Sequence, residues 1–354
     1  MLCSRTISIS IKNVGCFHAS RPLSFSSKTF RIANESNVVS IFDRYTKSLQ
    51  RERASLANDV NLYDYLKDEI GYRLADRVLD IKRKFGLAAD LGCGRGYVAK
   101  HLSRDSIDQL ILCDVSKYNL EAASSTVEDD IKIKKKILDE ENIEFKSNSL
   151  DLVLSNLNLH WVNDLPRAFK QILKALKEDG VFLASVFGGD TLYELRSSLQ
   201  LAEQERRGGI SPHISPFTEM RDIGSLLTNA GFSMLTIDTD EIVVHYPTIF
   251  ELMWDLKGMA ESNAAFNRSL HLHRDTQFAA AAIYQELYGK VDPETGNTTV
   301  PATFQVINML GWKPHPSQPT PLQRGTGEVS VKDLYRLDEI IKEVNSVKKG
   351  DQDK

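Results

Sequence analysis

The residues best suited to hold a ligand are glycines and acidic side chains at the ends of expected strands. They are Asp90, Gly92, Gly94, Gly96, Asp114 and Asp139. The glycines form a G-x-G-x-G pattern directly after an apolar run, and their missing Cβ atoms let a ligand lie against the backbone. Because the carboxyl ends of parallel strands meet at one edge of a sheet, we expect the three acids beside this loop. The pattern therefore predicts a small-molecule site at that edge.

The spacing of the glycines argues against a dinucleotide as the ligand. The dinucleotide fingerprint is G-x-G-x-x-G, and Tyr97 stands where its third glycine would be. Asp114, at the tip of the second expected strand, can accept hydrogen bonds from both hydroxyls of a ribose. Asp139 could accept one from an exocyclic amine. Since three carboxylates would repel phosphates, a nucleoside without phosphates is the better candidate.

Expected strands and helices alternate around these residues. The apolar runs predict strands over 86–90, 108–114, near Ile137–Leu138, over 150–156 and over 181–188. Helical patterns cover 40–56, 62–85, 97–104, 116–125 and 164–180, the last closed by Gly180. This order predicts a doubly wound, Rossmann-like α/β sheet with right-handed crossovers. Residues 233–247 are expected to form a hairpin of two antiparallel strands.

The first 34 residues differ from the rest in composition. They contain five Lys or Arg, many serines and no Asp or Glu, which is typical of a mitochondrial transit peptide. Without them, 39 basic residues face 48 acidic ones, which argues against general nucleic-acid binding. No apolar run is long enough to predict a transmembrane helix. We therefore expect a transit peptide at 1–34, a ligand-binding domain at 40–247, its extension at 248–327 and a polar tail at 328–354.

Four segments around the glycine loop resemble known motifs. LAADLGCGRG, LILCD, LDEEN and LDLVLSN are similar, in order and spacing, to the motifs of class I S-adenosylmethionine-dependent methyltransferases. The resemblance covers about 85–187 and implies S-adenosyl-L-methionine as the cofactor, with an antiparallel last strand in the sheet and a helical C-terminal extension. It implies that the glycine loop cradles the methionine part, that Asp114 holds the ribose and that Asp139 meets the adenine. Asp90 would orient the loop and the ammonium group.

A closer resemblance covers about 41–327. IFDRYTKSLQRERAS, SNLNLHWVNDLP, FGGDTLYELRSSL and VPATFQVINMLGWKPHPSQPTPLQRGTG are similar to a family of mitochondrial complex I assembly factors of methyltransferase fold, described as arginine hydroxylases. The resemblance implies an arginine of an iron–sulfur subunit of complex I as the substrate and other assembly factors as partners. It also implies peripheral attachment to the matrix side of the mitochondrial inner membrane.

Two other functions remain open at this stage. The chain is also similar to malonyl-acyl-carrier-protein O-methyltransferases, so it could methylate a carboxylate or a protein. It could instead be a non-catalytic assembly chaperone that binds S-adenosylmethionine. We expect the C-terminal third to separate the first family from the biotin-pathway methyltransferases.

Candidate substrate contacts follow the fourth expected strand. Methyl transfer needs mainly alignment and exclusion of water, so polar and aromatic residues at the rim are sufficient. The candidates are Asn156, Asn158, His160 and Trp161, of which Asn156, His160 and Trp161 are assigned a catalytic role.

Other polar segments are weaker candidates. The acids Asp238, Asp240, Glu241, Asp255 and Glu261 could hold the guanidinium of an arginine substrate. The Gly- and Pro-rich loop 207–217 is a candidate lid. The segment HLHRD has metal-like residues, but its flanks predict a helix, on which they would not converge; we expect a surface cluster and no metal site.

Overall fold

The computed structural model describes residues 8–10, 40–123, 131–291 and 296–319. Residues up to Pro314 belong to one compact unit, and those from His315 onward to a second. Most of the expected transit peptide and the whole polar tail at 328–354 lie outside the described residues. Within 1–34, Ser8–Ser10 form strand β1, which pairs in parallel with part of β7.

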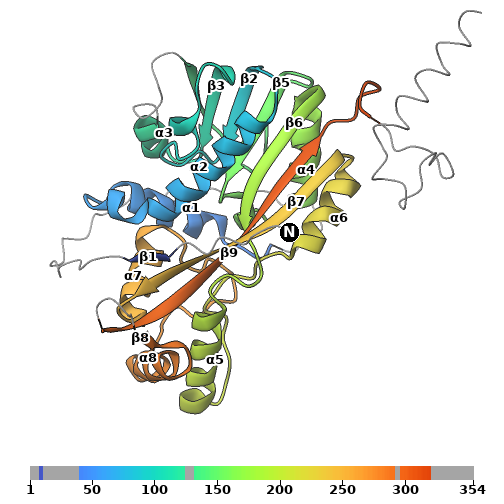
Figure 1. Ribbon diagram of the computed structural model, residues 1–354. Helices are drawn as coiled ribbons and strands as arrows, with labels where there is room; N and C mark the ends of the chain where they lie inside the picture. The colour runs from blue at the N-terminus through green and yellow to red at the C-terminus, as the bar shows by residue number, and fades with distance from the viewer. Residues whose placement is uncertain (1–7, 11–39, 124–130, 292–295, 320–354) are drawn as a thin grey trace, which may run out of the picture. The chain divides into compact units, whose positions relative to one another are not determined.

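The strands of the first unit form a mixed sheet in the order β1–β7–β9–β6–β5–β2–β3–β4 (Figure 1). Neighbours from β6 through β5, β2 and β3 to β4 are parallel, whereas β9 runs antiparallel to both β6 and β7. The strands are β1 (Ser8–Ser10), β2 (Phe85–Leu91), β3 (Ile107–Asp114), β4 (Lys132–Ile137), β5 (Leu150–Asn156), β6 (Leu176–Phe187), β7 (Ser233–Tyr246), β8 (Lys290–Val291) and β9 (Thr298–Trp312). The Rossmann-like sheet with an antiparallel last strand is thus confirmed.

Helices cover both faces of the parallel part of the sheet (Figure 1). Apolar residues of α2 and α3 pack on one face, and those of α4 and α6 on the other. Near the ends of β7 and β9, α5, α7 and α8 share a separate apolar core. The α-helices are α1 (Arg44–Ser55), α2 (Tyr65–Asp80), α3 (Lys117–Ala123), α4 (Leu165–Ala175), α5 (Tyr193–Arg207), α6 (Met220–Ala230), α7 (Ile249–Gly258) and α8 (Arg274–Tyr288). Short 3₁₀ turns are η1 (Val60–Tyr63), η2 (Ala99–His101) and η3 (Leu159–Trp161).

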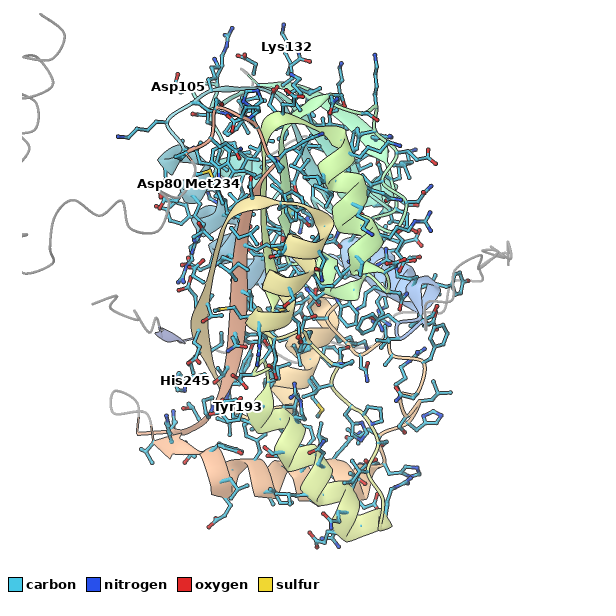
Figure 2. All side chains as sticks on the ribbon, turned by 90° about the vertical axis from the view of Figure 1, so that its right-hand side faces the viewer. Asp80, Asp105, Lys132, Tyr193, Met234 and His245 are labelled. Atoms are coloured by element: carbon cyan, nitrogen blue, oxygen red, sulfur yellow. The ribbon has the colours of Figure 1, made fainter. Side chains whose placement is uncertain are left out.

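The direction of the strands fixes where a ligand site can lie. Figure 2 shows Asp105 and Lys132 at one end of the sheet, where β3 and β4 begin, and His245 and Tyr193 toward the other end. The carboxyl ends of the parallel strands therefore face the half of the unit that holds α5, α7 and α8. None of the helices described between residues 44 and 288 is long and apolar enough to cross a membrane.

The hairpin expected over 233–247 is wrong. β7 is one continuous strand, paired with β9 from Ser233 to Tyr246. Its polar middle is not a turn, because Asp238 and Asp240 there receive ion pairs from Arg77 and Arg73 of α2. The extension 248–327 therefore supplies α7 and α8, and also the antiparallel strand β9 between β6 and β7.

Two helix predictions also need correction. The helix expected to close at Gly180 ends at Ala175, and the chain passes directly into β6, with Asp179 in a left-handed conformation (φ 58°). The helix expected over 97–104 is reduced to the 3₁₀ turn η2. Its first residues instead belong to a series of turns that follow the glycines.

Candidate functional site

A cavity lies at the carboxyl ends of β2, β3 and β5. Its wall includes Gly92 and Gly94 after β2, Asp114 at the end of β3, and Asn156 at the end of β5. Helix α1 contributes Arg51, and residues 258–261 close the opposite side. The remaining space is about 50 Å³, whereas ligand sites commonly measure roughly 300–1,000 Å³. A ligand the size of a nucleoside therefore requires some of the lining side chains to shift.

The glycine loop is a tight turn, as expected. Gly92 and Gly94 have φ angles of +68° and +54°, which favour glycine. A Cβ at Gly92 would stand 1.9 Å from the Asn158 side-chain nitrogen, and one at Gly94 would stand 2.6 Å from the Tyr97 ring. Gly96 also has a positive φ, 84°, but does not line the cavity. The loop thus needs glycine partly because the protein's own side chains lie against it.

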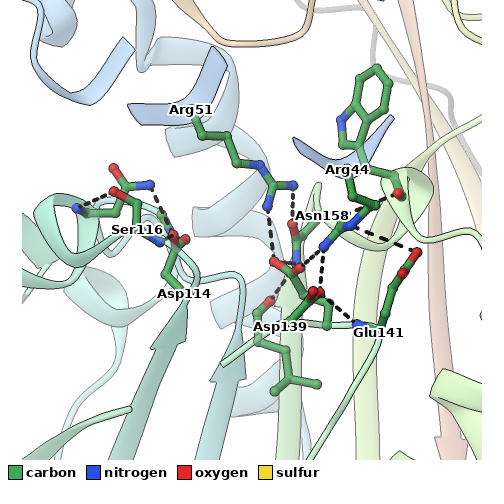
Figure 3. Close-up of polar contacts among 12 residues, drawn as sticks. Arg44, Arg51, Asp114, Ser116, Asp139, Glu141 and Asn158 are labelled. Atoms are coloured by element: carbon green, nitrogen blue, oxygen red, sulfur yellow. Dashed lines mark hydrogen bonds and ion pairs between the residues drawn. The ribbon is translucent and has the colours of Figure 1, made fainter. Parts of the chain in front are cut away.

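Asp114 is buried at the cavity wall and binds the glycine loop (Figure 3). Its carboxylate accepts hydrogen bonds from the Gly94 backbone N–H (3.0 Å), the Ser116 backbone N–H (2.7 Å) and the Asn119 amide (3.3 Å). Burial raises the pKa of Asp114 above its ordinary value, although Arg51 opposes the shift. Asp114 is therefore placed both to shape the loop and to meet a ligand.

Asp90 is fully buried at the end of β2 and does not line the cavity. Neither of its carboxylate oxygens has a hydrogen-bond partner among the described residues. Burial, and then the nearby charge of Asp114, raises the pKa of Asp90 to about 7. A buried carboxyl group that has no hydrogen-bond partner and lies next to the glycine turn can stabilise a bound cationic group.

The acids after β4 bind helix α1 (Figure 3). Asp139 lies outside the cavity wall, where it accepts a hydrogen bond from Arg44 at 2.8 Å. Its neighbour Glu140 is fully buried and forms ion pairs with both Arg44 and Arg51 (3.0 Å to Arg51). Arg51 also donates to the Asn158 side chain. The acids that follow β4 therefore bind α1, which contributes Arg51 to the cavity wall.

The rim candidates after β5 separate into two pairs. All four are buried, but Asn156 and Asn158 line the cavity, whereas His160 and Trp161 do not. Both ring nitrogens that face the site reach Glu261: Trp161 Nε1 donates at 2.9 Å, and His160 Nε2 lies at 3.3 Å. His160 and Trp161 therefore support a cavity residue instead of contacting the cavity themselves.

Of the expected substrate-binding acids, Glu261 lines the cavity and the others do not. Asp238 and Asp240 pair with arginines of α2, and Asp255 accepts hydrogen bonds from Tyr65 and Tyr246. The candidate lid 207–217 contributes no described residue to the wall. Its Phe217 instead packs against Phe187.

The HLHRD segment lies at the start of α8, where His271, His273 and Asp275 are exposed. Among the residues that the structure describes, no three His, Cys, Asp or Glu side chains are grouped so as to hold a metal ion.

Sequence reasoning missed the basic residues of the site. Arg44, Lys47 and Arg51 recur at helical spacing, so they share one face of α1, and all three are largely or fully buried. A cationic helix face of this kind is a signal that the helix covers acidic residues. Lys67 of α2 and the buried Glu140 were also missed.

The doubly wound sheet, the G-x-G-x-G turn and the carboxylate at the end of β3 define a class I methyltransferase fold. In agreement, residues 89–184 match the family described as "Methyltransferase domain".

The chain belongs to the NDUFAF5 arginine-hydroxylase family. It is 52% identical over 303 residues to the Homo sapiens protein named "Arginine-hydroxylase NDUFAF5, mitochondrial", with 86% of each chain covered. It is 44% identical over 306 residues to the Dictyostelium discoideum protein of the same name, covering 82% of this chain and 69% of that one.

A more distant relationship connects the chain to malonyl-acyl-carrier-protein O-methyltransferases. It is 31% identical over 282 residues to "Malonyl-[acyl-carrier protein] O-methyltransferase" of Methylovorus sp. (strain MP688), covering 77% of this chain and 91% of that one. Both the identity and the share of this chain that is covered are lower than for the Homo sapiens relative.

Proposed function

We propose that this protein is a mitochondrial arginine hydroxylase that acts early in the assembly of respiratory complex I. The observation that carries this proposal is the 52% identity to a protein named as an arginine hydroxylase over 86% of both chains. That match extends well beyond the 89–184 segment common to methyltransferases. We further propose, from the family resemblance, that the substrate is an arginine of an iron–sulfur subunit of complex I.

S-adenosyl-L-methionine is the proposed cofactor, and the residues present fit it. Asp114 lies at the cavity wall where a ribose would meet it, and Gly92 and Gly94 expose backbone there. The unpartnered carboxyl group of Asp90 suits the cationic end of the ligand. Asp139 is the proposed contact of the adenine, and this contact requires the hydrogen bond from Arg44 to Asp139 to break. Since the cofactor carries an activated methyl group, the same site would also support methylation, the alternative function.

The two reactions leave different marks on an arginine. Hydroxylation inserts one oxygen atom of dioxygen into a C–H bond, and an external two-electron donor reduces the second oxygen atom to water. Methylation replaces a hydrogen by a methyl group. The proposed roles of Asn156, His160 and Trp161 are to orient the substrate, directly for Asn156 and through Glu261 for the other two.

The proposed location is the mitochondrial matrix, with peripheral attachment to the inner membrane and contacts to other assembly factors. The relatives' name includes the word mitochondrial, and residues 1–34 have the composition of a transit peptide.

Mass spectrometry of complex I subunits, with and without this protein, tests the proposal. We expect one arginine of an iron–sulfur subunit to gain a single oxygen atom only when the protein is present. A gain of CH₂ would support a methyltransferase instead. If assembly fails without the protein but no subunit changes mass, and the Asp114→Ala variant restores assembly, the protein is a binding factor and not an enzyme.

Binding of S-adenosylmethionine is expected to release protons through Asp90. With a pKa of about 7, the buried carboxyl group is partly protonated near neutral pH, and a bound cation would favour its ionised form. We therefore expect release of roughly half a proton per ligand near pH 7, measured by calorimetry in buffers of different ionisation enthalpy. Asp90→Asn should abolish the buffer dependence. Equal proton release by both proteins would contradict the role of Asp90.

A further inference from the structure

A second part of the cavity wall is made by the end of α7 and the residues after it. Gly258, Met259, Ala260 and Glu261 line this wall together with Lys67 of α2. Ala260 adopts a left-handed conformation (φ 60°), which costs free energy for a residue with a Cβ. This conformation turns the chain at the position before Glu261, and the Glu261 side chain lines the cavity.

The Glu261 carboxylate is held on both oxygens. Oε2 accepts a hydrogen bond from Trp161 Nε1 at 2.9 Å and lies 3.3 Å from His160 Nε2. Oε1 forms an ion pair with Lys67 Nζ at 2.9 Å. Burial alone would raise the pKa of Glu261, but Lys67 and His160 lower it well below its ordinary value. The side chain is therefore an ionised carboxylate, fixed from behind by aromatic residues and paired with a lysine.

Two lysines contact this wall, and they differ in role. Lys47 of α1 is buried behind it, 3.2 Å from the centroid of the Trp161 ring, and donates to the carbonyl oxygens of Ala260 (2.9 Å) and Ser262 (3.0 Å). Lys67 lines the cavity itself and donates to the Met259 carbonyl oxygen at 2.7 Å as well as to Glu261. Lys47 thus supports the wall, whereas Lys67 occupies the cavity side of the carboxylate.

The other carboxylates of the cavity wall, those of Asp64 and Asp114, bind residues of the glycine loop. Asp64 forms an ion pair with Arg95 at 2.8 Å and accepts a hydrogen bond from the Tyr97 hydroxyl at 2.6 Å; Arg95 lies between Gly94 and Gly96, and Tyr97 follows Gly96. Asp114 accepts from Gly94 of the same loop. Glu261, in contrast, contacts His160 and Trp161, which follow β5, and β5 lies on the other side of β2 from β3, the strand that ends in Asp114.

We infer that Glu261 binds the guanidinium group of the arginine substrate, and that Lys67 pairs with Glu261 while no substrate is bound. This inference rests on the proposed function, because it takes arginine as the substrate. A guanidinium group presents a planar fork of donors that matches a carboxylate, whereas an ammonium group is a single point charge. An incoming arginine can therefore replace Lys67 on Glu261 Oε1, while Trp161 and His160 keep the carboxylate in position.

The test measures binding of N-acetyl-arginine-amide, and of its neutral citrulline counterpart, to the full-length protein saturated with S-adenosylmethionine. Lys67→Met should bind the arginine compound about tenfold more tightly, because the carboxylate is left free. Glu261→Gln should bind it about tenfold more weakly, although glutamine keeps an acceptor for Trp161. Neither change should alter binding of the citrulline compound. Lys100→Met, which removes a lysine paired with Asp68 outside this wall, should change nothing.

The opposite effects of Lys67→Met and Glu261→Gln on arginine binding distinguish a substrate site from an ion pair that is only structural. If both variants weaken arginine binding, or if neither the wild type nor Lys67→Met prefers arginine to citrulline, the inference is wrong. Weaker binding of S-adenosylmethionine by Lys67→Met also overturns it, because the pair would then hold the amino-acid end of the cofactor. The double variant Lys67→Met/Glu261→Gln, which lacks both charges of this pair, should lose the gain in arginine binding that Lys67→Met alone shows.

These results stand apart from the test of the proposed function. A protein that distinguishes arginine from citrulline as expected, while complex I arginines keep their mass, would contradict hydroxylation and leave the guanidinium site intact. If a complex I arginine gains one oxygen atom but the variants do not change arginine binding as expected, only the role of Glu261 is contradicted.

Discussion

Replacing Asp114 with alanine lowers the affinity for S-adenosylmethionine by about 10- to 150-fold, which corresponds to about 1.5–3 kcal/mol. The variant loses a charged acceptor for the ribose hydroxyls. It also loses the acceptor that holds the Gly94 N–H at 3.0 Å, so the turn that exposes backbone to the ligand is less ordered. Isothermal titration calorimetry of the full-length protein measures the change.

Asp108→Ala is the matched control for this prediction. Asp108 belongs to the same strand, β3, but its side chain is half exposed and pairs with Lys84 at the far end of the strand. This variant should bind S-adenosylmethionine as the wild type does. Unchanged affinity in Asp114→Ala would remove Asp114 from the site, and an equal loss in both variants would point to a general effect on the strand.

The central parallel strands were predictable because they are largely buried on both faces. β2, β3 and β5 are short apolar runs with a polar residue at or next to their ends, and such runs indicate a parallel sheet without knowledge of their partners. The sequence of β7 indicates strand, but the pairing of β7 with β9 has no comparable local signal. β7 is half exposed and polar in its middle, and its partner β9 follows only after α7 and α8. Pairing over that distance is a property of the tertiary structure.

The glycine-loop side of the cavity was predictable for a similar local reason. A run of glycines and an acid at a strand end are recognisable where they stand, and the structure places Gly92, Gly94 and Asp114 at one cavity. The acids after β4 are different, because Asp139, Glu140 and Glu141 are chemically alike and adjacent in sequence. The turn after β4 buries only Glu140 completely, and the arginines that select it belong to α1, far away in the chain.

Trp161 illustrates the same limit on the substrate side. Its position after β5 is compatible with a substrate contact or with a buried aromatic residue. In the structure Phe42 packs edge-on against the indole, and Glu261 accepts its N–H, so Trp161 is buried between these two residues. Both partners come from distant parts of the sequence.

Replacing Glu140 with glutamine destabilises the protein by about 3–5 kcal/mol near neutral pH. Arg44 and Arg51 are only 12% and 14% exposed, so the variant leaves two nearly buried guanidinium groups without their shared counter-charge. Urea denaturation measures the free energy of unfolding. Asp139→Asn is the control, because Asp139 also binds Arg44 but is 39% exposed, and such a pair contributes about 0–1 kcal/mol.

The pH dependence of the Glu140 effect follows from its pKa. Burial opposes ionisation, but Arg44 and Arg51 outweigh it and lower the pKa of Glu140 to about 2, from an ordinary value of 4.5. A group whose pKa is lower in the folded than in the unfolded protein stabilises the fold at pH values above its unfolded pKa, here by about 3 kcal/mol. This contribution is lost as the pH falls through its folded pKa. The difference between wild type and Glu140→Gln should therefore be constant above about pH 5 and shrink between about pH 4.5 and 2, whereas Asp139→Asn should show little such change. A difference that stays the same down to pH 3 would mean that the ion pairs with α1 do not stabilise the fold.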